Sequence, residues 1–396
     1  MTPNNTRIIH ERYPIPISVV LGYFSIITLC ITSLALPLSP RTLKFVNRSI
    51  ILPLIILVCV YIYRTCCTHI EDSPGHRFGM PSHAIGLTLR AIDTLLFSGD
   101  PHKTLFRTSS PTPPRTFTER LKYSIAFWST FRGINWNWES RKTPKAVNTT
   151  KMNFLTGHMT NIIWRYLLMD SIDAFLRTAG FFTVPPRLMG EMSLGTPLRH
   201  LAGLAHGVHL WQLIEMSYSS MVIPCVLLNL SSTKECPPQF GSISQATTIA
   251  TYWSTLWHGN WKKPFVGVSL GIVRFLRLPT IFGMIVTFVV SGLFHSLLTL
   301  SLHRGDFSTG AGKGALISFS IQPIGILLEK VFQSKVLPLI PSNISQSRAF
   351  KSLSYVWVIL WLSNTSIYAF DEVNQAGLFT KPLLPFSPIS LVLNKM

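Results

Sequence analysis

Two short stretches of this 396-residue chain place a histidine inside strongly apolar sequence. The first is SGLFHSL, in which His295 is the only readily ionisable side chain between Arg277 and His303. A charged side chain in the middle of a bilayer costs roughly 3 kcal/mol or more, so an ionisable residue there indicates function. Desolvation favours the neutral imidazole, the form that accepts a proton from an alcohol. We predict that His295 is a general base. The alternative is a histidine that only hydrogen-bonds to neighbouring helices.

The second stretch is WSTLWHGNWKKPF, residues 253–265. Its three tryptophans recur every four residues, so on a helix they would form one stripe suited to the membrane interface. Such a stripe does not account for His258 and Asn260, whose hydrogen-bonding groups an interfacial helix does not need. Gly259 weakens a helix and leaves backbone groups free for a ligand. We therefore predict that His258 is a second catalytic residue and that Trp257 and Asn260 contact a substrate.

A third cluster, FWSTFRGINWNWESRKTP at 127–144, is too polar for a membrane span and too aromatic for an ordinary cytosolic loop. We interpret it as an interfacial segment that packs on the helix bundle; an amphipathic anchor among the lipid headgroups is the alternative. Four polar residues in or near these clusters are candidates for holding a phosphorylated co-substrate, although each cation is also explained as part of a basic flank: Arg132, Asn135, Lys262 and Lys263.

The composition requires a membrane to surround these residues. The chain is 47% hydrophobic and only 13% charged, with a mean hydropathy of +0.34, which is too apolar for a soluble protein of this length. A helix needs roughly 20 apolar residues to cross a bilayer. We predict an all-α, polytopic membrane helix bundle with about six to eight transmembrane segments that enclose a reaction tunnel. The candidate segments are 15–39, 201–230, 278–302, 314–328 and 353–370, a short one at 49–63 and a weak one at 376–393.

Basic residues divide the chain and bear on its orientation. The net charge is +19, and Lys and Arg gather between residues 103 and 151. We therefore divide the chain into residues 1–150, with the early membrane segments and this basic loop, and a membrane-embedded core at 151–396, with the motif region beginning near 127. The positive-inside rule places the basic loop in the cytosol. The linker that carries Arg41, Lys44 and Arg48 is basic too, so the rule contradicts itself if 49–63 crosses the membrane.

The sequence gives little support to nucleic-acid binding by the basic residues or to metal binding by the cysteines. No nucleic-acid recognition module accompanies the basic residues, so we expect contact with anionic membrane lipids and no nucleic-acid partner. The six cysteines include no CxxC pair and no metal-ligand spacing, so we predict no metal site. No internal repeat is visible, which disfavours transporters built from duplicated halves. The sequence does not indicate an oligomeric state.

Three motifs in order, RGINWNW, YWSTLWHGNW and SGLFH, resemble the membrane-bound O-acyltransferase superfamily. The resemblance is to its wax-synthase-like branch, which is common among fungal secondary-metabolite acetyltransferases, and it covers about residues 127–330, including QPIGILLEK at 322–330. His295 matches the family's catalytic histidine, and His258 matches a second position that is asparagine in many relatives. The chain departs from the family where Thr255 and Leu256 replace a common basic pair and where Lys330 replaces an acidic residue.

The resemblance implies that an acyl-CoA donor and a hydroxyl acceptor meet in a membrane-embedded tunnel. Neutral His295 would remove the hydroxyl proton as the oxygen attacks the thioester, and His258 and Asn260 would orient the donor or stabilise the oxyanion. The branch favours acetyl-CoA as co-substrate, no tightly bound cofactor, a hydrophobic terpenoid or meroterpenoid alcohol as acceptor, and a multi-pass protein of the endoplasmic reticulum.

Two alternatives stay open at the level of sequence. Long-chain acyl-CoA donors would make the protein a wax or neutral-lipid ester synthase. A transporter of a lipid or metabolite would use His295, His209 and Glu215 as a translocation path, but it would not explain the motif around His258. His206, His209 and Glu215 lie on one hydrophobic segment, where we expect structural hydrogen bonding in preference to lining an acceptor cavity.

Overall fold

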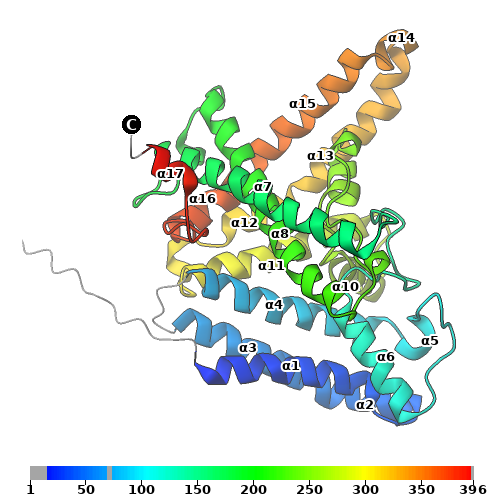
Figure 1. Ribbon diagram of the computed structural model, residues 1–396. Coiled ribbons are helices and arrows are strands. Elements are labelled where there is room, and N and C mark those ends of the chain that lie inside the picture. The colour runs from blue at the N-terminus through cyan, green and yellow to red at the C-terminus, as the bar shows by residue number, and fades with distance from the viewer. Residues whose placement is uncertain (1–15, 69–73, 394–396) are drawn as a thin grey trace, which may run out of the picture.

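The computed structural model describes residues 16–68 and 74–393, and within them it is helical, with isolated bridges in place of strands (Figure 1). The longer helices are α1 (Ile17–Ala35), α3 (Leu52–Thr68), α4 (Pro74–Ile92), α6 (Phe117–Ser129), α7 (Lys151–Thr178), α8 (Pro197–Leu227), α10 (Lys262–Phe275), α11 (Phe282–Leu302), α12 (Lys313–Ser320), α13 (Gln322–Val331), α15 (Arg348–Thr365) and α16 (Ile367–Gln375). The shorter ones are α2 (Pro40–Val46), α5 (Pro101–Thr104), α9 (Ile249–Thr251), α14 (Ser342–Ser345) and α17 (Pro388–Leu393).

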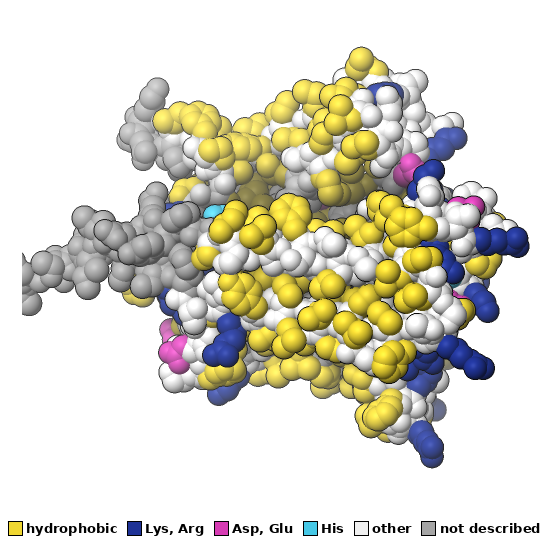
Figure 2. All heavy atoms as spheres, turned by 90° about the horizontal axis from the view of Figure 1, so that it is seen from below, with side chains coloured by type: hydrophobic (Ala, Val, Ile, Leu, Met, Phe, Trp, Pro, Cys, Tyr) yellow, Lys and Arg dark blue, Asp and Glu magenta, His cyan; other side chains and the backbone are white. Residues whose placement is uncertain are grey.

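Six helical segments of the described chain are long and apolar enough to cross a membrane, which confirms the predicted polytopic all-α bundle. The predicted short segment at 49–63 is part of a continuous helix, Pro40–Thr68, whose 29 residues suffice for a crossing. The weak segment at 376–393 is not a span, because its helical part is only α17. Figure 2 shows one face covered by hydrophobic side chains, with Lys and Arg gathered mainly along its right-hand edge.

Helix α4 was not predicted to be a membrane segment, because its sequence carries several histidines and arginines. It nevertheless packs against α3, α11, α10 and α1 inside the bundle. Arg90 near its end is fully buried among aromatic rings and donates hydrogen bonds to the carbonyls of Phe127 and Trp128. Burying a guanidinium requires that its donors be satisfied, and these carbonyls satisfy them.

The path of α4 removes the contradiction in the positive-inside rule. Arg48 donates to the carbonyl of Leu96 at 2.6 Å, and Arg120 donates to the carbonyl of Leu36 at 2.7 Å. The basic linker after α1 and the basic loop after α4 therefore lie at the same end of the bundle, which we call the basic end. Helix α3 leaves this end and α4 returns to it. The rule then assigns the basic end to the cytosol without conflict.

The opposite end of the bundle is defined by contacts of α11. Tyr63 donates to the carbonyl of Leu297 at 2.9 Å, and Ser301 donates to the carbonyl of Arg77 at 2.8 Å. Helix α11 therefore runs from the basic end to the opposite end. His303, just after it, hydrogen-bonds the carbonyl of Glu372 at 3.0 Å, which places α16 at the opposite end too.

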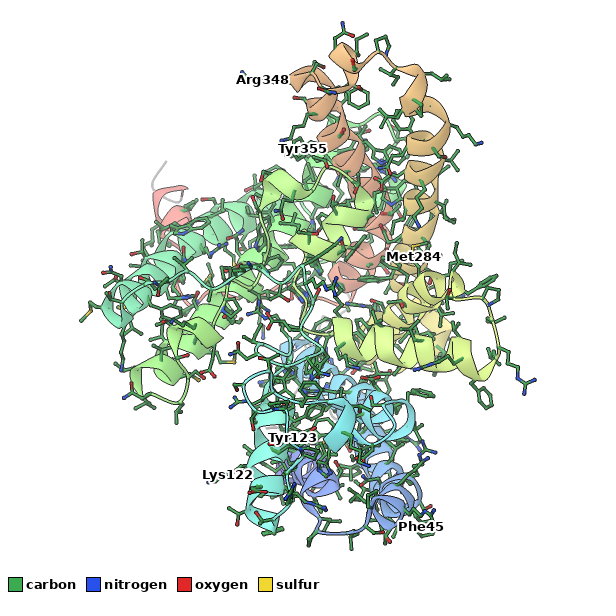
Figure 3. The ribbon with its side chains drawn as sticks, turned by 90° about the vertical axis from the view of Figure 1, so that its right-hand side faces the viewer. Phe45, Lys122, Tyr123, Met284, Arg348 and Tyr355 are labelled. Atoms are coloured by element: carbon green, nitrogen blue, oxygen red, sulfur yellow. The ribbon has the colours of Figure 1, made fainter. Side chains whose placement is uncertain are left out.

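Two helical hairpins complete the bundle. Helices α7 and α8 are antiparallel, because Lys151 at the start of α7 donates to the carbonyl of Leu227 at the end of α8. Between them, Arg165 lies 3.6 Å from Glu215 and donates to Gln212 at 2.6 Å. The second hairpin, α13 with α15, projects from the body with α14 at its tip (Figure 1). Figure 3 looks onto the basic end, where Lys122 of α6 and Arg348 at the start of α15 lie at opposite margins.

Candidate active site

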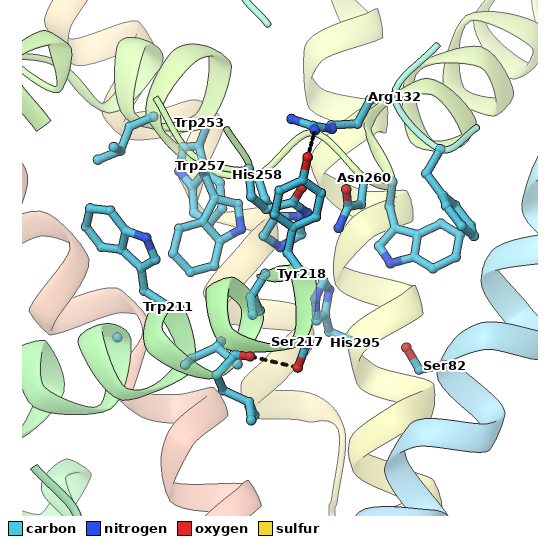
Figure 4. A pocket seen from close by; sticks show the side chains of 18 of the residues that line it. Ser82, Arg132, Trp211, Ser217, Tyr218, Trp253, Trp257, His258, Asn260 and His295 are labelled. Atoms are coloured by element: carbon cyan, nitrogen blue, oxygen red, sulfur yellow. Dashed lines mark hydrogen bonds between the residues drawn. The ribbon is translucent and has the colours of Figure 1, made fainter. Parts of the chain in front are cut away.

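A cavity of about 1520 Å³ runs through the bundle between its two ends. Gly203 and Phe370 line it toward the opposite end, and Arg132 and Tyr218 line it toward the basic end. His258 and His295 lie between them and point into the cavity (Figure 4). Small-molecule sites usually measure about 300–1,000 Å³, so this cavity has room for two ligands at once.

His295 has the hydrogen-bonding pattern of a base. Its Nδ1 lies 2.8 Å from the carbonyl oxygen of Ser291, one turn earlier on α11. A carbonyl only accepts hydrogen bonds, so Nδ1 carries the hydrogen and Nε2 carries the lone pair. The ring stacks on Phe319 with centroids 3.9 Å apart and planes 13° apart, which fixes its orientation. The backbone carbonyl of Ser291 therefore orients the imidazole.

His258 lies in a non-helical segment between α9 and α10. The helical turn Tyr252–Leu256 ends at Trp257, whose backbone is extended, and His258 then contacts the rings of Phe240 and Trp257. Burial lowers the pKa of His258 to about 3, and the nearby charge of Arg132 acts in the same direction. Its ring is therefore neutral near pH 7. Among the described residues, none hydrogen-bonds to its buried Nδ1.

The three tryptophans around His258 do not form the predicted stripe. The turn that holds Trp253 has π-helical hydrogen bonding and stops before Trp257, so the four-residue periodicity is lost. Trp253 donates to Gln322 on α13, Trp257 stacks on Tyr252, and Trp261 packs directly over Gly86 of α4. Trp253 and Trp261 thus fasten the segment to α13 and α4, whereas Trp257 packs within the segment.

A smaller pocket of about 170 Å³ adjoins the cavity and shares Arg132 and Trp257 with it. Lys142 and Lys262 line this pocket, and Ser254 accepts a hydrogen bond from each, through its hydroxyl from Lys142 at 2.9 Å and through its carbonyl from Lys262 at 3.2 Å. Burial, followed by the neighbouring charge of Lys142, lowers the pKa of Lys262. Two cations that share Ser254, with no carboxylate partner in the described part of the chain, have the charge needed to bind a polyanion.

The other predicted cations are engaged elsewhere. Lys263 also lines the smaller pocket, but it is paired with Asp93 at 2.7 Å. Arg132 lines both cavities and donates to the carbonyls of Pro237 and Pro238 and to the hydroxyl of Tyr218 (Figure 4). Arg132 therefore holds the 237–240 segment beside His258. Sequence reasoning did not single out Lys142, which is 120 residues from Lys262 and was one of many cations in the basic loop.

The remaining predicted residues divide between the cavity and the scaffold. Asn260 and Trp257 line the cavity. Asn135 lies outside both pockets; it has a positive φ of 65°, and its carbonyl accepts from Thr108, so it forms a turn. The three predicted polar residues of α8, His206, His209 and Glu215, also lie outside the cavity. His206 hydrogen-bonds Asn374 and Glu215 pairs with Arg165, as expected for structural groups. The buried Nε2 of His209 lies 3.9 Å from Asp173 and has no hydrogen-bond partner among the described residues.

This arrangement suits acyl or similar group transfer between an anionic donor and an apolar acceptor. A basic nitrogen, Nε2 of His295, lies in a cavity whose lining is apolar toward one end. At the basic end, Lys142 and Lys262 can bind a phosphorylated group. Among the described residues, no cluster of His, Cys, Asp and Glu that could hold a metal ion is found.

Comparisons with known proteins agree with this chemistry. A family model described as "Membrane bound O-acyl transferase family" matches residues 236–319, which include both histidines. The chain is similar to acetyltransferase eriL of Hericium erinaceus, with 25% identity over 76% of this chain and 78% of the relative. It is also similar to acetyltransferase pyr8 of Aspergillus fumigatus, with 24% identity over 70% of each chain. For acetyltransferase aurG of Calcarisporium arbuscula the identity is 24%, over 74% and 75% of the two chains.

No solved structure matches the chain. The family model, the relatives and the six apolar helices agree with one another, and the family implies an acyl-CoA co-substrate and an alcohol acceptor. Residues 236–319 are therefore similar to the membrane-bound O-acyl transferase family, and the protein is an integral membrane acyltransferase.

Proposed function

We propose that the protein transfers the acetyl group of acetyl-CoA to a hydroxyl of a hydrophobic secondary metabolite, a terpenoid or meroterpenoid, in the endoplasmic reticulum membrane. The observation that carries the proposal is the free Nε2 of His295 in a cavity with a cationic pocket beside its basic end and apolar walls toward its opposite end. The three relatives, all of them acetyltransferases, support acetyl-CoA as the donor.

The reaction assigns one proton to His295. Nε2 takes the hydroxyl proton while the alcohol oxygen forms a bond to the thioester carbonyl carbon. The tetrahedral intermediate then collapses, the carbon–sulfur bond breaks, and the imidazolium returns the proton to the departing CoA sulfur. His258 and Asn260 donate hydrogen bonds to the oxygen on which negative charge develops. No covalent acyl-enzyme is needed.

The two ends of the cavity suit the two substrates. The phosphates of acetyl-CoA bind Lys142 and Lys262 at the basic end, which faces the cytosol. The acceptor occupies the half between α8, α15 and α16, which is lined by Gly207, Leu362 and Phe370 among others. Its apolar walls favour a largely hydrocarbon alcohol over a sugar or a nucleotide.

Label transfer tests the function directly. Microsomes that contain the protein are incubated with radiolabelled acetyl-CoA or palmitoyl-CoA and a panel of hydroxylated terpenoids, and the ester is recovered in organic solvent. The proposal expects labelled acetate ester with at least one acceptor. Esters formed only from palmitoyl-CoA would make the protein a long-chain ester synthase. Movement of an acceptor across the membrane without CoA release would identify a transporter and overturn the proposal.

Changing Lys142 and Lys262 together to alanine is expected to raise KM for acetyl-CoA at least about 10-fold, because each charge-assisted hydrogen bond to phosphate is worth roughly 1.5–3 kcal/mol. The value of kcat should change little, since the phosphates are remote from the thioester. S-acetylpantetheine lacks the nucleotide and its phosphates, so its KM should be the same in both proteins. Lys103→Ala, at an exposed lysine of the same loop, is the matched control. An unchanged KM for acetyl-CoA would place the phosphates elsewhere.

Filling the acceptor half should select against bulky alcohols. Gly207 lines the cavity, and a Cβ built on it meets no atom within 4 Å. Gly207→Phe is therefore expected to lower kcat/KM for a polycyclic alcohol about 10-fold or more, while a short-chain alcohol is less affected. Gly157→Phe is the control, because Gly157 is equally open but lies on α7 outside the cavity. Equal loss with large and small alcohols would contradict the assignment of this half to the acceptor.

A further inference from the structure

Gln322, the first residue of α13, is buried and uses every hydrogen-bonding position of its amide. Its Nε2 donates to the carbonyl of Ser318 at 2.7 Å and to the hydroxyl of Thr365 at 3.0 Å. Its Oε1 accepts from the indole of Trp253 at 3.1 Å and from the indole of Trp361 at 3.0 Å. An amide has two donors and two lone pairs, so Gln322 is saturated and its orientation is fixed.

Only one of the two indoles is attached to the segment that carries His258. Trp253 lies five residues before His258, and its ring contacts that of Trp257 with centroids 5.9 Å apart. Trp257 in turn contacts the ring of His258 at 5.3 Å. Trp361 belongs to α15, a different element, and donates to the same oxygen of Gln322.

A second residue of α13 holds the beginning of the same segment. Glu329 is buried, and its carboxylate accepts hydrogen bonds from the backbone N–H groups of Ile249 at 2.6 Å and Ala250 at 3.3 Å. It also accepts from the indole of Trp357 on α15 at 2.9 Å. Residues seven apart lie on one helix face, so Gln322 and Glu329 grip the segment with the same side of α13.

The helix face between these two residues is pressed against the segment. A Cβ built on Gly325 would lie 2.5 Å from Ile249 and 2.6 Å from Trp361, so only glycine permits this approach. On this face of α13, the amide of Gln322 and the carboxylate of Glu329 therefore anchor the segment that begins at Ile249. Gly325, between them, allows that segment to approach closely.

We infer that Gln322 and Glu329 are positioning residues, which fix the Ile249–Trp257 segment and thereby hold His258 opposite His295. This inference rests on the proposed function of His258. Neither residue transfers a proton or contacts the reacting atoms in this mechanism. Their effect is on the geometry of a hydrogen-bond donor that must meet the developing oxyanion, where a misplacement of about 1 Å costs roughly 100-fold in rate.

Two matched variants test the inference. Trp253→Phe and Trp361→Phe each keep a large ring and remove one N–H bond to the same oxygen of Gln322. Trp253→Phe is expected to lower kcat at least about 10-fold with KM for acetyl-CoA within about twofold of the wild type. Trp361→Phe should keep kcat within about twofold of the wild type. Both variants lose one hydrogen bond, so they should lower the Tm of the detergent-solubilised protein by similar amounts. Equal kcat in the two variants would overturn the inference.

A double-mutant cycle separates positioning from general stability. In a His258→Ala background, Trp253→Phe should cost less in kcat than it does in the wild type, because the donor that it positions is absent. Full additivity would contradict the coupling to His258. Glu329→Gln and Trp357→Phe give a second comparison, in which the first should lower kcat and the second should not. Absence of acetyl transfer by the wild type would instead refute the proposed function, so the two failures are distinguishable.

Discussion

Replacing His295 by alanine is expected to lower kcat for acetyl transfer by about 10²–10⁴-fold, the usual contribution of a general base. The structure supplies the reason: Nδ1 is committed to the carbonyl of Ser291, so the lone pair of Nε2 is the one available to the acceptor hydroxyl. KM for acetyl-CoA should change little, because the proposed phosphate site at Lys142 and Lys262 does not include α11. Initial rates with labelled acetyl-CoA in microsomes, normalised to the amount of protein, measure the effect.

A suitable control is His303→Gln. His303 follows the same helix but bonds the carbonyl of Glu372 and does not line the cavity. His303→Gln should therefore lower the stability of the protein more than it lowers kcat. If His295→Ala transfers label at the wild-type rate, His295 is not the base and the mechanism above is wrong.

Replacing His258 by alanine is expected to lower kcat by about 10²–10³-fold, the loss seen when one oxyanion donor is removed. His258→Asn should recover part of that loss, because an amide N–H can donate where the imidazole N–H did. The pKa of His258 is lowered to about 3, so its ring stays neutral above that pH and the loss should not vary between about pH 6 and 8. Measuring kcat and KM across this range checks both points.

The ranking of the two substitutions discriminates between roles. If His258 donates to the oxyanion, kcat should be highest in the wild type, lower in His258→Asn and lowest in His258→Ala. A residue that only orients the thioester in the ground state would instead raise KM for acetyl-CoA and leave kcat unchanged. Equal kcat in all three proteins would exclude His258 from the chemical step.

Hydropathy predicted the apolar helices of the fold but not the polar ones. Helix α4 was missed because Arg90 counts as a charge in the sequence, although the carbonyls of Phe127 and Trp128 and nearby rings surround it in the structure. Helix α7 was not proposed as an element for a similar reason, since Arg165 is paired with Glu215 of α8. A hydropathy scale gives each residue a value from its type alone. It therefore cannot include hydrogen-bond or ion-pair partners that come from distant parts of the chain.

In the candidate site, too, some features could be predicted from the sequence and others could not. His295 and His258 could be selected because polar groups in apolar sequence are visible without a structure. The tryptophans do not form the interfacial stripe that their spacing would give on a continuous helix, because the turn ends before Trp257. The pairing of Lys142 with Lys262 could not be predicted, because only the tertiary fold brings both to Ser254.

The placement of the two histidines partway between the basic end and the apolar half has a consequence for what leaves the enzyme. In the proposed reaction, free CoA is anionic and returns to the aqueous side from which the donor came. The ester has lost a hydroxyl and partitions more strongly into lipid than the alcohol did. The two products thus depart into different phases, and dilution of the ester in the bilayer draws the acetylation forward.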